Sequence, residues 1–125
     1  MLRVTTKSSP EAAETQIRDS LANAGFGVLT EIDMSGTLAS KLGVEVGYLK
    51  ILGACNPKFA YEALQADRNV ALLLPCNVVI DSDANGTAIS VPDPGDLLPG
   101  NEDFTGPVKE LLRGALSAIG EVQES

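Results

Sequence analysis

The chain contains no histidine and no tryptophan, and only three phenylalanines and two tyrosines among its 125 residues. Without histidine, neither a Ser-His-Asp nor a Cys-His catalytic arrangement can be assembled within one chain. The core must therefore rest on Leu, Ile, Val and Ala, and the 44% hydrophobic share is that of a globular protein. The length is that of one ordinary domain, so we predict a single domain over residues 1–125.

Basic residues are also few, with nine Lys and Arg against 17 Asp and Glu and a net charge of −8. Such a chain repels phosphate backbones and anionic lipid surfaces, so no nucleic-acid partner is expected. No apolar run approaches the ~18–20 residues of a membrane span, so no membrane partner is expected. The first seven residues hold no apolar stretch typical of a signal peptide, which predicts a cytoplasmic protein.

Glycine-rich phosphate loops of the forms GxxxxGK[ST] and GxGxxG are missing as well. The two cysteines are too few for a disulfide framework, and with no histidine beside them they leave a zinc ion without a full ligand set. We therefore predict no metal site, with a soft metal held by cysteines across a dimer as the remaining alternative. No cofactor is assigned.

One segment imitates the start of a calcium-binding EF-hand loop, with Asp81, Asp83, Asn85 and Gly86 at the corresponding spacing. The twelfth position is Pro92, where a bidentate glutamate is required. The Asn-Gly step accounts for the same residues as a hairpin turn. We therefore interpret the segment as a turn between two strands.

Apolar periodicity and cap residues predict the order of elements. Ser9 and Pro10 begin a first helix that Gly25 ends, Asn56 caps a third helix, and Gly106-Pro107 opens the last one. Strands are predicted over residues 2–7, 28–33, 48–54, 70–74, 78–80 and 87–91, and a short second helix over residues 35–43. Residues 92–103 are predicted to be irregular.

This order, with helices alternating with strands early and strands clustered later, favours a two-layer α+β domain. We expect one mostly antiparallel sheet with helices packed on one face. The other face must be solvated, covered by a loop or buried in a dimer. The apolar segments 72–74 and 78–80 favour a homodimer.

The two cysteines lie in two similar motifs beside prolines, Gly53-Ala54-Cys55-Asn56-Pro57 and Leu74-Pro75-Cys76-Asn77. Cys55 precedes the predicted start of a helix, where backbone N–H groups and the helix dipole favour a thiolate and lower the pKa of a thiol. Pro75 removes a ladder hydrogen bond and should bend its strand, which would turn Cys76 towards a pocket. We predict a ligand site at Cys55, Asn56, Cys76 and Asn77, with both cysteines as candidate catalytic residues. The alternative is that both are apolar filler beside a cap and a bulge.

These motifs, in this order and joined by a helix that carries Ala60, Ala63 and Leu64, resemble the family of domains of unknown function numbered 302 (DUF302). The similarity extends over residues 4–120, and the step Val91-Pro92-Asp93-Pro94 resembles the segment before the family's last helix. Ile80-Asp81-Ser82-Asp83 departs from the family pattern, in which a polar or aromatic residue often follows the second motif. The resemblance implies an α+β fold of the TATA-binding-protein-like architecture, usually dimeric. It implies no settled activity and no DNA binding, because function resides in the site rather than the fold.

Three functions are compatible with these observations. The first is a homodimeric protein that binds a small molecule near the two Cys-Asn motifs. The second is a thiol-dependent redox or sulfur-handling enzyme that uses Cys55 and Cys76. The third is a structural or assembly domain. Whether the chain is an enzyme is left open by the sequence.

Overall fold

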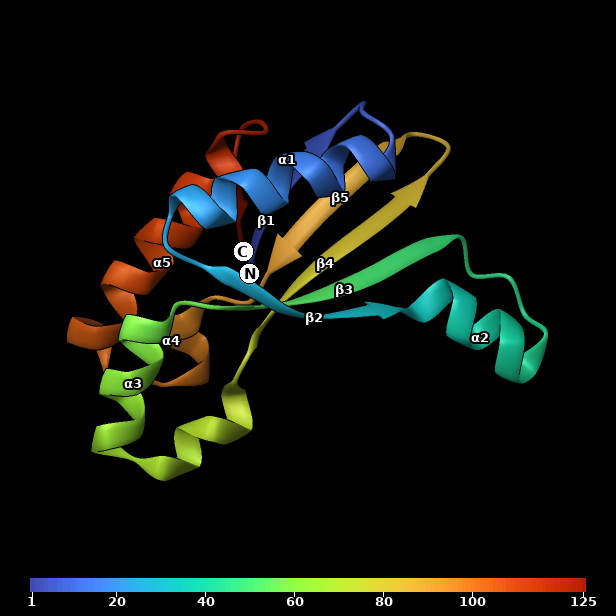
Figure 1. Cartoon of the computed structure of the whole chain (residues 1–125). Coiled ribbons are helices and arrows are strands. Elements are labelled where there is room, and N and C mark those ends of the chain that lie inside the picture. The colour runs from blue at the N-terminus through green and yellow to red at the C-terminus, as the bar shows by residue number, and fades with distance from the viewer.

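A six-stranded antiparallel sheet, in the order β2-β3-β4-β5-β1-β6, forms one layer of the computed structural model, which describes all 125 residues (Figure 1). Helices α1 and α5 form the second layer. The elements are β1 (Leu2–Thr6), α1 (Pro10–Asn23), β2 (Gly27–Asp33), α2 (Met34–Leu42), β3 (Tyr48–Cys55), α3 (Pro57–Ala66), the 3-10 helix η1 (Arg68–Leu73), β4 (Cys76–Asp83), β5 (Gly86–Val91), α4 (Pro94–Leu97), α5 (Glu102–Ser117) and β6 (Gln123–Glu124). The predicted α+β class with a mostly antiparallel sheet is thus confirmed.

Strict alternation along the strands creates an inner and an outer sheet face. The core lies between the inner face and helices α1 and α5. The buried hydrophobic strand residues of this core are Leu2, Val4, Leu52, Ala54, Val78, Ile80, Ile89 and Val91. The helices contribute Ala13, Ile17, Leu21, Val108, Leu112, Ala115 and Leu116. The buried residues of α1 recur four residues apart, so they form one face of the helix.

Helix α1 begins and ends at the residues that the sequence predicts. The Ser9 side chain accepts a hydrogen bond from the backbone N–H of Ala12, and Pro10 occupies the first helical turn. Gly25 follows the helix with a φ of +88°, a conformation that glycine adopts without a steric penalty. The chain then turns into β2 at the edge of the sheet.

A ring of four charged side chains ties α1 to this edge. Lys50 of β3 contacts Glu14 of α1 at 2.8 Å and Glu31 of β2 at 2.7 Å, and Arg18 contacts both carboxylates at 2.9 Å. Burial raises the pKa of Glu14, but hydrogen bonds from Lys50 and Arg18 outweigh it, so the pKa lies below its ordinary value. The hydrogen bond that Lys50 donates to Glu14 is the chief reason why the pKa of Lys50 is raised. Both groups are therefore charged at neutral pH.

The outer sheet face is covered by no helix (Figure 1). One cross-strand row on this face runs Arg3, Ser90, Val79, Ile51 and Ile32, from β1 to the β2 edge. It is polar at the β1 end, where the Arg3 side chain donates a hydrogen bond to Ser90, and apolar at the β2 end. Ile32 is 46% exposed.

Helix α2 projects away from the body of the molecule beside this apolar end (Figure 1). It contains no buried residue, and Leu42 is 70% exposed. Asp33 caps the helix by accepting from the N–H of Gly36, and Ser35 bonds the backbone of Leu49. Hydrogen bonds thus anchor α2 at its base, although the helix buries none of its residues. No helix of the chain is both long and apolar enough to cross a bilayer.

Three sequence predictions need correction. Residues 70–74 are not a strand, because Arg68–Leu73 forms the 3-10 helix η1. The last helix does not begin at Gly106-Pro107, because Glu102–Ser117 is helical and Pro107 lies inside it. Residues 92–103 are not wholly irregular, because Pro94–Leu97 forms α4.

The C-terminus adds a strand that the sequence analysis did not predict. Gln123 and Glu124 pair with Arg3 and Leu2. Glu124 contacts both Lys109 and Arg113 of α5, and these two partners lower its pKa to about 2. The two termini therefore lie side by side at the β1 edge (Figure 1).

Candidate functional site

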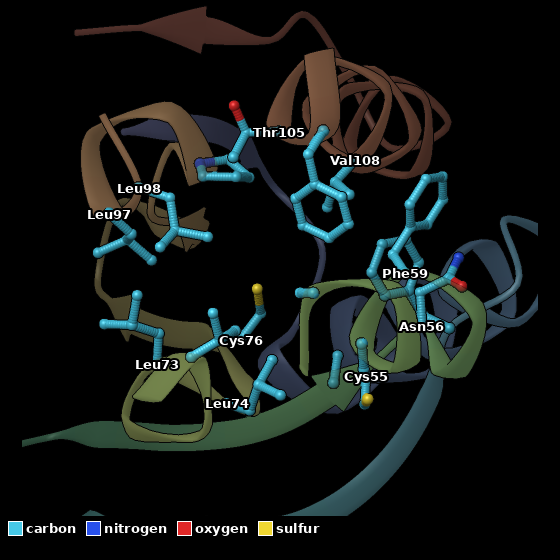
Figure 2. A pocket seen from close by; sticks show the side chains of 17 residues that line it. Cys55, Asn56, Phe59, Leu73, Leu74, Cys76, Leu97, Leu98, Thr105 and Val108 are labelled. Carbon is cyan, nitrogen blue, oxygen red and sulfur yellow. The ribbon is translucent and has the colours of Figure 1, made fainter. Parts of the chain in front are cut away.

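An apolar pocket lies at the end of the sheet where β3 ends and β4 begins (Figure 2). Its volume is about 60 Å³, and 14 of its 17 lining residues are hydrophobic. Its walls come from β3, β4, α3, η1, α4 and α5. The lining residues are Phe26, Ala54, Cys55, Asn56, Phe59, Ala60, Ala63, Val70, Leu73, Leu74, Cys76, Pro94, Leu97, Leu98, Phe104, Thr105 and Val108.

The two cysteines are neighbours at this pocket but point to opposite sides of the sheet. Cys76 is directly opposite Ala54 in the β3–β4 pair, so its side chain shares the inner face with Ala54. Cys55 is the next residue along β3 and therefore points the other way. Figure 2 shows the Cys76 sulfur directed into the pocket and the Cys55 sulfur directed away from it. Both cysteines are free thiols.

The sequence predicts a lowered pKa for the Cys55 thiol, and this prediction is wrong. Partial burial raises the pKa of the Cys55 thiol, with no opposing contribution from a cation. Burial also raises the pKa of Cys76, and the nearby Cys55 adds to this shift. Both sulfurs are therefore protonated at neutral pH.

The two asparagines of the motifs lie in different places. Asn56 precedes α3, as predicted, but its side chain makes no capping hydrogen bond. Its amide instead lies against Gly25, where a Cβ atom would come within 3.2 Å of Asn Nδ2. Asn77 is exposed and pairs with Gly53 on the outer face. Of the four predicted site residues, the structure thus brings Cys55, Asn56 and Cys76 to the pocket and leaves Asn77 outside it.

The two sequence motifs are packed together through their glycine and proline. A Cβ atom on Gly53 would lie 2.7 Å from Cγ of Pro75 and would also collide with the Thr30 hydroxyl. The Leu74–Pro75 peptide bond is cis. The Gly53 position is therefore the place at which the proline ring of the second motif rests on the first.

The far wall of the pocket is formed by α4 and α5. The rings of Phe59 and Phe104 meet edge to face, with centroids 6.0 Å apart. The carboxylate of Asp93, which caps α4, contacts Lys109 of α5 at 2.9 Å. The hydrogen bond from Lys109 chiefly lowers the pKa of Asp93. This ion pair fixes α4 against α5 and so closes the pocket on that side.

Sequence reasoning missed most of the pocket wall. The sequence predicts Leu73 in a strand, Leu97 and Leu98 in an irregular segment, and Phe104 and Thr105 before the last helix. The structure instead places Leu73 in η1, Leu97 at the end of α4, Leu98 directly after it, and Phe104 and Thr105 in α5. The available signal was the pair of adjacent leucines at positions 97 and 98, which a solvated loop has no reason to carry.

No cluster of three or more Cys, Asp or Glu side chains is arranged to hold a metal ion. The segment that imitates a calcium loop forms the β4–β5 hairpin, as predicted. Asp83 accepts a hydrogen bond from the backbone N–H of Asn85 and thereby stabilises the turn.

Comparison with known proteins agrees with this architecture. None of the curated proteins matches the chain. A crystal structure of an uncharacterized conserved protein DUF302 from Bacillus stearothermophilus is similar, with a TM-score of 0.87 and 25% sequence identity over 94% of this chain and 95% of that one. The family model named "Domain of unknown function DUF302" matches residues 2–119. The chain therefore belongs to the DUF302 family.

Proposed function

We propose that the chain is a small ligand-binding domain whose site is the apolar pocket at Cys76. The observation that carries the proposal is the pocket itself, which is lined almost entirely by hydrophobic side chains and lies where the two motifs meet. Apolar pockets with a few polar groups are the usual form of small-molecule sites. The ligand would be held by burial of its apolar part, with Cys76 as a neutral neighbour.

We further propose that the domain works as a homodimer. The support is the outer sheet face, where Val79, Ile51 and Ile32 form an apolar row beside the projecting helix α2. Exposed apolar surface of this kind marks interaction sites more often than solvated faces. A second copy of the chain would cover it.

The thiol-enzyme hypothesis has no comparable support. The two sulfurs point to opposite sheet faces, and the pKa of each thiol lies above its ordinary value. A thiol is a weak nucleophile until it is deprotonated.

Dissolved xenon tests the binding proposal, because apolar cavities bind this atom. We expect xenon to shift the methyl NMR signals of Val108, Leu74 and Leu98 and to leave those of Ile51 unchanged. Ala60→Leu, which fills the pocket from α3, should abolish the shifts.

Ala39→Leu is the matched control, because Ala39 is exposed on α2. This variant should respond to xenon as the unaltered protein does. Xenon shifts that are absent at the pocket methyls, or that persist in Ala60→Leu, would contradict the proposal.

A further inference from the structure

The pocket at Cys76 adjoins a second hollow on the molecular surface. This outer hollow has a volume of about 410 Å³ and is lined by residues 72–77, Pro92 and Leu97. Four residues line both hollows, namely Leu73, Leu74, Cys76 and Leu97. Because these four residues line both hollows, the two lie next to each other, and a ligand that reached from one into the other would contact all four.

The inner hollow accepts only a narrow apolar group. Its volume of about 60 Å³ is below the about 150 Å³ of an engineered cavity that admits benzene. The hydroxyl of Thr105 already donates to the backbone carbonyl of Asn101, and the Asn56 amide points away from the pocket centre. The end of an alkyl chain satisfies these limits better than a ring or a polar group.

The outer hollow offers hydrogen bonds without charge. Its polar side chain is Asn77, whose amide both donates and accepts. No Lys, Arg, Asp or Glu lines either hollow. Burying a charged group without a partner is costly, and the net charge of −8 disfavours an anion in particular.

We propose that the site takes a small uncharged amphiphile, whose alkyl end enters the pocket at Cys76 and whose polar head lies in the outer hollow beside Asn77. The inference rests on the proposed ligand-binding function and names the chemical class of the ligand. Leu72, which is 86% exposed at the rim of the outer hollow, is then an apolar contact for the middle of the chain.

Titration with 1-hexanol, hexanoate and hexylamine, followed by methyl NMR, tests the head group. We expect 1-hexanol to shift the methyl signals of Val108 and Leu74 and to bind at least about tenfold more tightly than either charged analogue. Equal or tighter binding of hexanoate or hexylamine would overturn the inference.

Asn77→Ala tests the position of the head, with Asn69→Ala on η1 as the matched control, because both asparagines are exposed. Asn77→Ala should weaken 1-hexanol about three- to tenfold, as expected for the loss of one neutral hydrogen bond, and should leave xenon binding unchanged. Equal effects of the two variants would overturn the inference. If xenon enters the pocket and 1-hexanol does not, this inference fails while the proposed function stands.

Discussion

The contact between Gly53 and Pro75 explains why the first Cys-Asn motif contains a glycine at this position. The proline ring occupies the space in which a side chain at position 53 would lie, on the outer face of the β3–β4 pair. Only glycine leaves that space free at this register. The two motifs are therefore one structural unit, although 20 residues separate their cysteines.

Gly53→Ala should destabilise the protein by about 1–3 kcal/mol, the usual cost of overpacking. Urea unfolding measures this change. Gly27→Ala is the matched control, because Gly27 also lies in a strand and an added Cβ would meet nothing within 4 Å. A loss of stability in the control as large as that in Gly53→Ala would show that strand glycines matter for another reason.

Both cysteines should behave as ordinary or slow thiols. Burial raises the pKa of Cys55 and of Cys76, so their alkylation rates should rise only above about pH 8.5, the value for a free thiol. Mass spectrometry after timed alkylation of the native protein measures each rate separately. A rate for Cys55 that is already maximal at pH 7 would restore the activated thiolate that the sequence suggested.

At the scale of elements, the sequence predicted most of the features that depend on residues close together in the chain. Ser9, Pro10 and Gly25 define α1 through local hydrogen bonds and backbone conformation, so their effect is readable from the chain alone. The apolar run at residues 70–74 is compatible with either a buried strand or a short helix, so its pattern does not distinguish the two. In the structure the segment forms η1, which packs on the preceding helix α3 and lines the pocket opposite residues that are distant in sequence.

The ion-pair ring between α1 and the β2 edge gives an element-scale prediction. Lys50→Met should destabilise the fold by about 1–2 kcal/mol, because it leaves Glu14, whose side chain is 16% exposed, with Arg18 as its remaining ion-pair partner. Chemical unfolding at pH 7 measures the loss. Glu14→Gln combined with Lys50→Met should recover part of it, and a fully additive double variant would contradict the coupling.

The same ring predicts the direction of acid sensitivity. The pKa of Glu14 is lower in the folded than in the unfolded chain, so the unfolded chain binds more protons near pH 4. The stabilisation that the Glu14 carboxylate contributes is therefore present above about pH 4.3 and is lost as the pH falls through the pKa of Glu14 in the folded chain. Glu14→Gln should flatten the fall in unfolding free energy between about pH 5 and pH 3, and an unchanged slope would contradict this account.

At the scale of the whole molecule, the order of elements predicted a sheet with helices on one face, and the structure places α1 and α5 on one face. The sequence predicted a site at the two motifs but not the walls that α4 and α5 contribute to the pocket. It also placed Asn77 with the other site residues, although alternation sends that side chain to the outer face. Successive side chains of a strand point to opposite sheet faces, so neighbouring residues of a motif do not generally reach the same site.

The open face gives the last prediction, on the oligomeric state. Sedimentation should show the unaltered protein at twice its mass of 13.0 kDa. Ile32→Glu should shift it towards the monomer, because the variant buries a carboxylate in the proposed contact between two apolar rows. Thr5→Glu adds the same charge at the polar end of the same face and should remain dimeric. A protein that is monomeric before any substitution would show that this face is solvated, and equal dissociation of both variants would show that the dimer contact is not confined to the apolar end.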